Sequence, residues 1–440
     1  MKLISCLMLG LLISSTAYCA DLAQLYQTAK VNDPTFSAAR ATRDAAEEKY
    51  YQGRSGLLPS VTLSGNVNWH DQDVRDRTAN TTAHNSYDSY GYNLNLTQPL
   101  FRWQNWVGFN QSKLLVSQAD LVYRQAEQEL ILRLAQAYFD VLYASENLQA
   151  VHALQKAIDS QLQRSRNAFE VGVGIQTDVF EAESRYDLAL AQVASAETDL
   201  AIRRQALQLI TGQPVDKLAP QRRGVALPSP QPLDSKQWLE NARTNNLAVQ
   251  QQQLNVKVSS SEVDKQRAGH YPTVDFVASK GYNDTLSSGH RQGTDELTAG
   301  IQISIPLYQG GVVTSRQREA VANRRAAESN LTAAQRAAEL SARQAYLSTV
   351  NGLAQVKALR AAVESSIKSM DSNRAAFDVG IRVNIDVLNA ENQVYSARRD
   401  LARAYFDTVM SQLKLKAAVG TLGEDDLMAV NGLLDPSQGI

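Results

Sequence analysis

The stretch AFEVGVGIQTDVFEAE at residues 168–183 returns as AFDVGIRVNIDVLNAE at residues 376–391. The residues that the two stretches share keep a constant offset, because 376 minus 168 and 391 minus 183 both equal 208. The same offset joins Gly212 to Gly420 without a gap. Solenoid repeats have periods of about 20 to 50 residues. A period of 208 therefore indicates a duplicated half-protein rather than a stacked array.

Each repeated stretch lies inside a long tract without proline, residues 100–213 in the first half and 307–435 in the second. Because proline is excluded from helix interiors, and both tracts are rich in Ala, Leu, Gln, Glu and Arg, they favour long helices. The glycines within them, Gly172 with Gly174 and then Gly380, predict one tight turn in each tract. The sequence thus predicts two antiparallel helix pairs, at residues 103–171 and 176–211 and at residues 311–379 and 384–419.

Residues suited to helix packing recur every seven positions along the second helix of each pair. A flanking row of small residues, which includes Ala189 and Ala196 and then Ala397 and Ala404, would let helices approach closely. This pattern predicts coiled-coil-like packing; the alternative is a pair of ordinary amphipathic helices in a globular core. The main rows are Tyr186, Val193, Leu200 and Leu207, and Val394, Leu401, Thr408 and Leu415.

Alternating apolar and polar residues predict two strands upstream of the helices in each half. Each strand has about the ten residues that a tilted membrane strand requires. The segments between the partners, residues 71–89 and 283–296, are polar, and we expect them to be long loops at the external end of a barrel. The predicted strands are residues 60–70, 88–100, 271–282 and 296–308.

Four strands cannot close a barrel, and an open sheet edge facing lipid would leave backbone groups unpaired. The chain is therefore expected to oligomerise. Two copies would give about eight strands, whose interior side chains fill, whereas three copies would give about twelve, enough for a channel. We predict an α+β fold in which a trimer closes the barrel and the long helices continue below it.

The first twenty residues have the layout of a secretory signal peptide, with Lys2, an apolar stretch at residues 3–13 and small residues after it. The mature chain is expected to begin near Ala20 or Asp21. Both cysteines, Cys6 and Cys19, lie in this segment, which excludes thiol and disulfide chemistry from the mature chain. Lipidation of Cys19 is the alternative, although the bulky Tyr18 before it does not suit a lipobox.

Composition and motifs exclude several functional classes. The 44 basic and 45 acidic residues nearly cancel, which argues against a nucleic-acid binder. The five histidines lack metal-ligand spacing, and no glycine-rich phosphate loop is present, so we expect no metal, cofactor or enzymatic activity. Ser365 and Lys368 fit a Ser-x-x-Lys string, but they lie within a predicted helix and have no companion motif.

The duplicated strand–strand–helix–helix order resembles the TolC family of outer-membrane exit ducts. The motifs that carry the resemblance are GLLP at residues 56–59, IPLYQGG at 305–311 and the VGxxxxxDV turn at 379–387. The resemblance implies a trimeric twelve-stranded outer-membrane barrel that continues into a twelve-helix periplasmic barrel. Its partners would be outer-membrane lipid, a periplasmic adaptor and an inner-membrane pump of the ABC or RND type.

The resemblance also implies a division of the chain. Two repeats, residues 21–213 and 235–423, would be joined by a proline-rich linker at 214–234, and residues 424–440 would form a C-terminal segment. A mixed equatorial belt would be built from residues 22–31, 214–232, 238–243 and 424–434.

By resemblance, the periplasmic tip is closed and its gate residues lie at the glycine turns. Asp386 would form a constricting carboxylate ring in a trimer, and Asn389 stands where the family commonly has a second aspartate, which halves the expected ring charge. Arg382 would pair with Thr177 and Asp178 of the neighbouring helix pair. The alternative for both aspartates is capping or stabilisation of a helix N-terminus. We call the contacts between neighbouring helix pairs the latch. Phe377 replaces a family tyrosine, so the latch would lose one hydrogen bond from a hydroxyl group.

These patterns predict a passive, trimeric exit duct for type I secretion or tripartite efflux, located in the outer membrane and extending into the periplasm. The rival hypothesis is a structural or adhesive coiled-coil trimer that conducts nothing. The predicted helices form antiparallel hairpins in both halves, whereas a stalk needs one parallel helix per chain.

Overall fold

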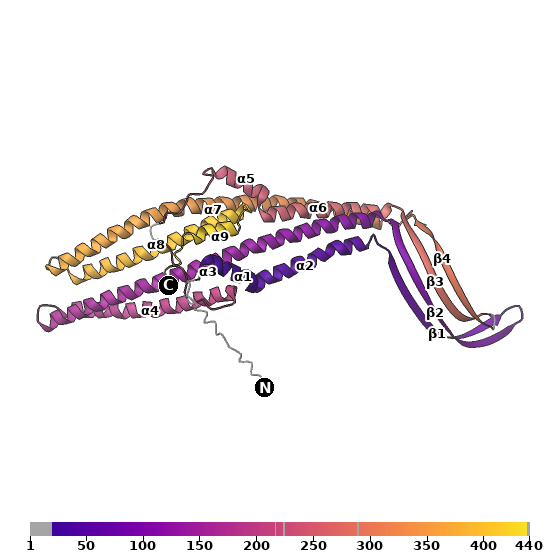
Figure 1. The fold of residues 1–440 in the computed structure, drawn as a ribbon, viewed down its shortest axis with the longest axis horizontal. Helices are drawn as coiled ribbons and strands as arrows, with labels where there is room; N and C mark the ends of the chain where they lie inside the picture. Colours follow the sequence, from indigo (N-terminus) through magenta and orange to yellow (C-terminus); the bar gives the residue numbers. More distant parts are fainter. Residues whose placement is uncertain (1–19, 216, 223–224, 288–289, 438–440) are drawn as a thin grey trace, which may run out of the picture. The chain divides into compact units, whose positions relative to one another are not determined.

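The computed structural model describes residues 20–215, 217–222, 225–287 and 290–437 (Figure 1). Most of the predicted signal segment therefore lies outside the described residues. The chain divides into two compact units. The hairpin unit comprises Met1–Ala39, Arg124–Leu247 and Gln335–Ile440, and the sheet unit comprises Arg40–Tyr123 and Ala248–Ala334.

The sheet unit contains four antiparallel strands in the order β1-β2-β3-β4. The first half of the sequence provides β1 (Ser60–Asp76) and β2 (Thr81–Phe101), and the second provides β3 (Thr273–Ser287) and β4 (His290–Ser304). Pairing of β2 with β3, for example of Leu94 with Lys280, joins the two halves into one sheet. Most of α2 (Pro34–Ser55) and α6 (Leu247–Arg267) belongs to the same unit.

At the hairpin ends the strands extend beyond the predicted bounds, and the expectation of long polar loops at residues 71–89 and 283–296 is wrong. At the other end, β3 begins at Thr273 instead of 271, and β4 ends at Ser304 instead of 308. Paired residues continue from Asp71 with Ser86 out to Asp76 with Thr81. In the second half, pairing continues to Ser287 with His290. Cross-strand backbone bonds hold these ends together although their side chains are mostly polar on both faces. The alternation that marks a half-buried strand is lost where neither face is apolar.

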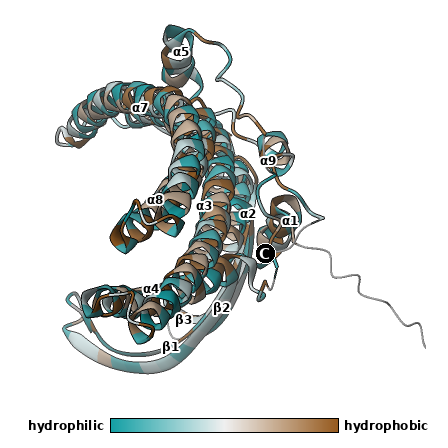
Figure 2. Ribbon diagram, turned by 90° about the vertical axis from the view of Figure 1, so that its left-hand side faces the viewer, coloured by the Kyte–Doolittle hydropathy of each residue, from teal (hydrophilic) through white to brown (hydrophobic). Residues whose placement is uncertain are grey.

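The hairpin unit is built on four long helices. They are α3 (Trp103–Glu170) and α4 (Gln176–Thr211) from the first half, and α7 (Val312–Asp378) and α8 (Asn384–Ala418) from the second. Both α3 and α7 also contribute residues to the sheet unit. Figure 2 shows hydrophilic and hydrophobic residues interspersed along these helices. Among the described residues, none of the helices is both long and apolar enough to cross a membrane.

Helix α8 packs against both helices of the first pair. Leu388 lies in one buried cluster with Leu154 and Ile158 of α3 and Ala189 of α4. Further along, Phe406 stacks on Phe139 with 5.3 Å between the ring centroids. The predicted packing rows are largely buried. Tyr186, Val193 and Leu401 are half-buried, and the buried members are Ala189, Ala196, Leu200, Leu207, Val394, Ala397, Ala404, Thr408 and Leu415.

Short elements surround the middle of the hairpin unit. They are α1 (Leu22–Asn32), α5 (Ser235–Asn245) and α9 (Glu424–Asn431). Isolated bridges join Ala20 to Leu218 and Gln221 to Leu434. The hydroxyl of the buried Tyr138 donates to the carbonyl of Ala219 at 2.7 Å. Ala20, Leu434 and the proline-rich segment thus lie together beside α3, in the region where the resemblance implies an equatorial belt.

Candidate functional site: the two hairpin tips

Each helix pair is joined by a turn of the same design. Gly172 and Gly380 both have φ of +78°, a left-handed conformation that glycine adopts without strain. The amide of Gly172 donates to the carbonyl of Phe169 at 3.0 Å, and that of Gly380 donates to Phe377 at 2.9 Å. The next amide in each turn reaches back to Ala168 or Ala376. These are Schellman-type helix ends, which reverse the chain sharply.

Gly174 has a separate reason to be glycine. A Cβ atom there would lie 3.0 Å from backbone atoms of Ala168 and Phe169, so the turn would have to shift by a few tenths of an ångström to accept a side chain. Its counterpart in the second half, at an offset of 208, is Arg382. The two turns therefore share a backbone design but differ in charge at this position.

Both turns expose aliphatic side chains at equivalent positions. Val171, Val173 and Ile175 are exposed at the first tip, and Val379, Ile381 and Val383 are exposed at the second. We call these six residues the apolar tip rim. Exposed aliphatic groups grouped in this way mark a contact surface more often than isolated ones do.

Asp386 forms an ion pair with Arg382, whose Nη1 lies 3.3 Å from the Asp386 Oδ2. The pair stays within the second tip. The predicted latch partners in the first tip, Thr177 and Asp178, lie in the first turn of α4, where Thr177 is exposed and Asp178 half-buried. Within the single chain, the structure brings Arg382 to Asp386 instead of joining it to these two residues. Phe377 is half-buried at the end of α7.

The aspartates do not cap their helices with side-chain bonds. The N-cap residues of α4 and α8 are Ile175 and Val383, and neither makes a side-chain cap bond. Asp178 and Asp386 lie in the first turn, where a negative charge is favoured by the helix dipole. The capping alternative is thus wrong for both, whereas stabilisation through the dipole agrees with their position.

Asn389 lies on the same exposed face of α8, and its Oδ1 accepts a bond from Arg185 of α4 at 3.2 Å. The same guanidinium nitrogen lies 3.4 Å from Glu181 Oε1. Glu181 is the repeat counterpart of Asn389, because 389 minus 181 equals 208. Arg185 therefore bridges two equivalent positions of the duplicated sequence and joins the two hairpins. The sequence analysis did not single out Arg185.

Each hairpin is also clamped across its own turn by an Arg–Glu pair. Arg166 Nη2 lies 3.0 Å from Glu183 Oε1 in the first hairpin, and Arg374 Nη2 lies 2.6 Å from Glu391 Oε1 in the second. The pairs are repeat-related, because 374 minus 166 and 391 minus 183 both equal 208. The glutamates lie within the two repeated stretches, whereas their partner arginines were not predicted. These arginines lie two residues upstream of Ala168 and Ala376 and keep the same offset of 208, which is the signal that marks them in the sequence.

Burial distinguishes the two clamps. The Glu391 side chain is only 3% exposed, whereas that of Glu183 is 46% exposed. Helix α8 packs on α3 and α4, and we attribute the burial of the Glu391 side chain to this packing. A buried carboxylate depends on its partner far more than an exposed one.

The seam between α3 and α8 near the tips also contains buried amides. Asn384 Nδ2 donates to Ser165 Oγ at 3.2 Å. Gln161, one helical turn from Ser165, is fully buried, and within the described part of the chain its side-chain amide has no protein partner. Unsatisfied buried amides weaken a packed interface, so this seam is easier to open than an apolar one.

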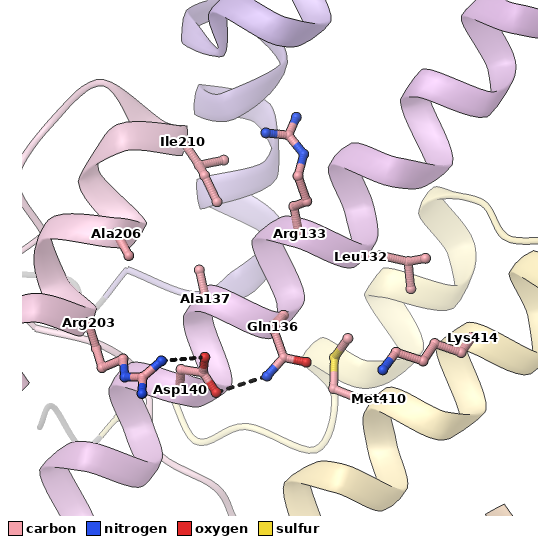
Figure 3. A pocket seen from close by; sticks show the side chains of 10 residues that line it. All are labelled: Leu132, Arg133, Gln136, Ala137, Asp140, Arg203, Ala206, Ile210, Met410 and Lys414. Carbon is pink, nitrogen blue, oxygen red and sulfur yellow. Dashed lines mark hydrogen bonds and ion pairs between the residues drawn. The ribbon is translucent and has the colours of Figure 1, made fainter. Parts of the chain in front are cut away.

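A cavity of about 420 Å³ lies in the hairpin unit away from the tips, between α3, α4 and α8 (Figure 3). Arg203 Nη1 lies 3.3 Å from Asp140 Oδ2, and Gln136 donates to the other oxygen of Asp140 at 2.8 Å. Arg203, Asp140 and Gln136 thus satisfy one another at the cavity wall. Across the described residues, no group of His, Cys, Asp and Glu side chains could hold a metal ion.

Comparison with known proteins identifies the family. The sequence pattern of the family described as "Outer membrane efflux protein" matches residues 25–213 and again residues 238–421. The outer membrane protein TolC of Vibrio cholerae is 34% identical over 428 residues, which cover 95% of each chain. The chain belongs to the TolC family of outer membrane efflux proteins.

Other TolC-family proteins match over similar lengths. The proteases secretion protein PrtF of Dickeya chrysanthemi is 33% identical, with 95% of this chain and 92% of that protein covered. The crystal structure of the Campylobacter jejuni outer membrane channel CmeC has the same fold, with a TM-score of 0.79 at 16% identity over 94% of this chain and 90% of that one. The TolC family consists of channel and transport proteins rather than enzymes.

Proposed function

We propose that this chain assembles as a homotrimer into a passive duct that crosses the outer membrane and extends into the periplasm. The duct serves type I protein secretion or tripartite efflux. The observation that carries the proposal is a sheet with one apolar face, one polar face and two unpaired edges, in the same chain as two long helical hairpins with equivalent tips.

The strand register separates the side chains by polarity. On one face, Leu63 pairs with Leu94, and Phe276 pairs with Ile301. On the other face, Ser64 pairs with Asn93, and Ser279 pairs with Thr298. Lipid would cover the first face and water the second. Aromatic residues lie on the apolar face beyond its aliphatic part, as an interfacial girdle would; they are Trp69, Tyr90, Tyr92 and Tyr282.

Two features support self-association. In the described sheet, β1 and β4 each pair on one side only, and an unpaired edge is not tolerated in lipid. The outer helices also carry exposed leucine and isoleucine rows with heptad spacing, which packing against another copy would bury. These rows are Leu188, Ile202 and Leu209 on α4, and Leu340 and Leu347 on α7. Three copies would supply about twelve strands, which is wide enough for a channel.

The hairpin tips provide a gate and a docking surface. Threefold symmetry would arrange Asp386 and Asn389 of α8 as rings around the pore, where Arg382 already lies beside Asp386. The apolar tip rim occurs twice in each chain, so a trimer would present six similar docking positions to a periplasmic adaptor. An inner-membrane pump of the ABC or RND type would supply the energy and the choice of cargo. Opening would loosen the hairpins along the seam between α3 and α8, where the buried amide of Gln161 lacks a protein partner.

The test is planar-bilayer conductance of the purified mature protein. Small, long-lived current steps from folded trimers are expected, since the closed tips leave a narrow path. Folded trimers that insert but carry no current would refute the duct and favour the rival structural or adhesive stalk. Removal of the tips is a second test of the duct. Joining Gln161 to Tyr186 and Ser369 to Tyr395 through short linkers should enlarge the current.

A further inference from the structure

We propose that Arg185 determines the ion selectivity of this duct. It neutralises Glu181 beside the pore constriction and engages the amide oxygen of Asn389, which would otherwise be free to bind a cation. The inference rests on the proposed function, because it concerns the pore that the trimer would form. It assigns a role to a residue that lies on the first hairpin, whereas the constriction residues lie on the second.

The contacts of Arg185 determine what Asn389 can offer to an ion. An arginine side chain can only donate hydrogen bonds, so the Asn389 atom that it contacts at 3.2 Å is the amide oxygen. That oxygen is engaged by the guanidinium, and the remaining amide group of Asn389 is an N–H donor. A ring of such side chains does not coordinate cations in the way that a carboxylate ring does.

The charges on this part of the tip balance within each chain. Arg185 lies 3.4 Å from Glu181, so Glu181, Arg185 and the uncharged Asn389 sum to zero. Arg382 lies 3.3 Å from Asp386, so that pair also sums to zero. Glu181 and Asp386, the two carboxylates of this group, therefore each have an arginine partner. A trimer adds no net charge to the constriction from these five residues.

The duplication shows how this neutrality arises. Asn389 and Glu181 are equivalent positions of the two repeats, and the first repeat has a carboxylate there. The second repeat has the amide, and Arg185 reaches across to it from α4. Arg185 thus contacts the residues at both repeat-related positions, Glu181 and Asn389. Loss of this arginine would leave Glu181 unpaired and would add one negative charge per chain.

The experiment measures reversal potentials in a salt gradient across planar bilayers, with full-length mature trimers. Arg185→Gln leaves the Glu181 of each chain unpaired. Three such carboxylates one Debye length, about 10 Å, from a permeating ion should raise the permeability ratio of cations to anions about fourfold. Asn389→Asp with Arg185 retained should change the ratio in the same direction. Arg203→Gln is the matched control, since Arg203 lies on the same helix and pairs with Asp140 and Asp199 away from the tip; it should leave the ratio unchanged.

Arg185→Lys separates charge from structure. It keeps the positive charge and loses the planar fork, so the wild-type ratio is expected to persist. A conducting wild type whose ratio does not change in Arg185→Gln would overturn the inference and leave the duct intact. Equal changes in Arg185→Lys and Arg185→Gln would also overturn it, because the role would then be structural. If no trimer conducts at all, the proposed function itself fails.

Discussion

The buried clamp of the second hairpin allows a prediction with an internal control. Replacement of Arg374 by alanine removes two hydrogen bonds to Glu391, at 3.2 and 2.6 Å, and leaves a carboxylate that is 3% exposed. The repeat-related change, Arg166→Ala, removes an exposed pair from the same position of the first hairpin. The two variants share their chemistry and differ in the burial of the glutamate that is left.

The expected cost can be bounded on both sides. Removal of one partner from a buried ion pair costs about 3 to 5 kcal/mol, and the partial exposure of Arg374 lowers this toward about 2 kcal/mol. Because Arg374 is itself partly exposed, the low end of that range, about 3 kcal/mol, is the upper bound. We therefore expect Arg374→Ala to destabilise the second hairpin by about 2 to 3 kcal/mol. The exposed pair should cost at most about 1 kcal/mol.

Amide hydrogen exchange with peptide resolution measures these local openings. Peptides from residues 376–391 should exchange about 30 to 160 times faster in Arg374→Ala, which is the predicted free energy expressed as a rate ratio. Peptides from residues 168–183 should change by no more than about fivefold in Arg166→Ala. Equal acceleration in the two variants would refute the reasoning, since burial of Glu391 would then have no energetic consequence.

Three further changes test other parts of the molecule. Asp386→Ala leaves Arg382 without its ion pair and should raise single-channel conductance or shift selectivity toward anions; unchanged values of both in bilayers would contradict the gate assignment. Ile202→Glu and Leu347→Glu place charges on the exposed heptad rows, so each should convert trimers to monomers in analytical ultracentrifugation, with helix content unchanged by circular dichroism. Gly380→Ala forces a side chain into a residue with φ of +78° and should accelerate proteolysis of the second tip, because the strain costs about 1 to 2 kcal/mol; cleavage at the wild-type rate would show that the turn tolerates it.

Local rules account well for the helices and the turns. The proline-free tracts and the glycines predicted helix ends close to those observed at Glu170, Gln176, Asp378 and Asn384. Helix ends are decided by residues within one or two turns, so a single sequence contains the information. The strand ends were not predictable in the same way, because residues 71–76 and 81–89 are held by backbone bonds to a partner strand.

The candidate site likewise has features that could be predicted from the sequence and features that could not. The glycine turns, Asp386 and Asn389 were found from the repeat and the resemblance, and the offset of 208 alone could have revealed both Arg–Glu clamps. The bridge from Arg185 to Asn389 spans 204 residues and two hairpins, and no sequence period connects them. The burial of Glu391 is likewise invisible in the sequence, since its repeat counterpart Glu183 has an identical side chain in an exposed position.

The sequence by itself determined the duplication, the helical hairpins, the tip turns and the polarity of the strands. These features depend on residue type, periodicity and local backbone preference. Only the tertiary structure decided which Arg–Glu clamp is buried and which arginine contacts Asn389. It also decided how far the strands extend. The physical reason is that burial and long-range hydrogen bonds depend on which surfaces pack together, and two copies of one pattern meet different neighbours in the folded chain.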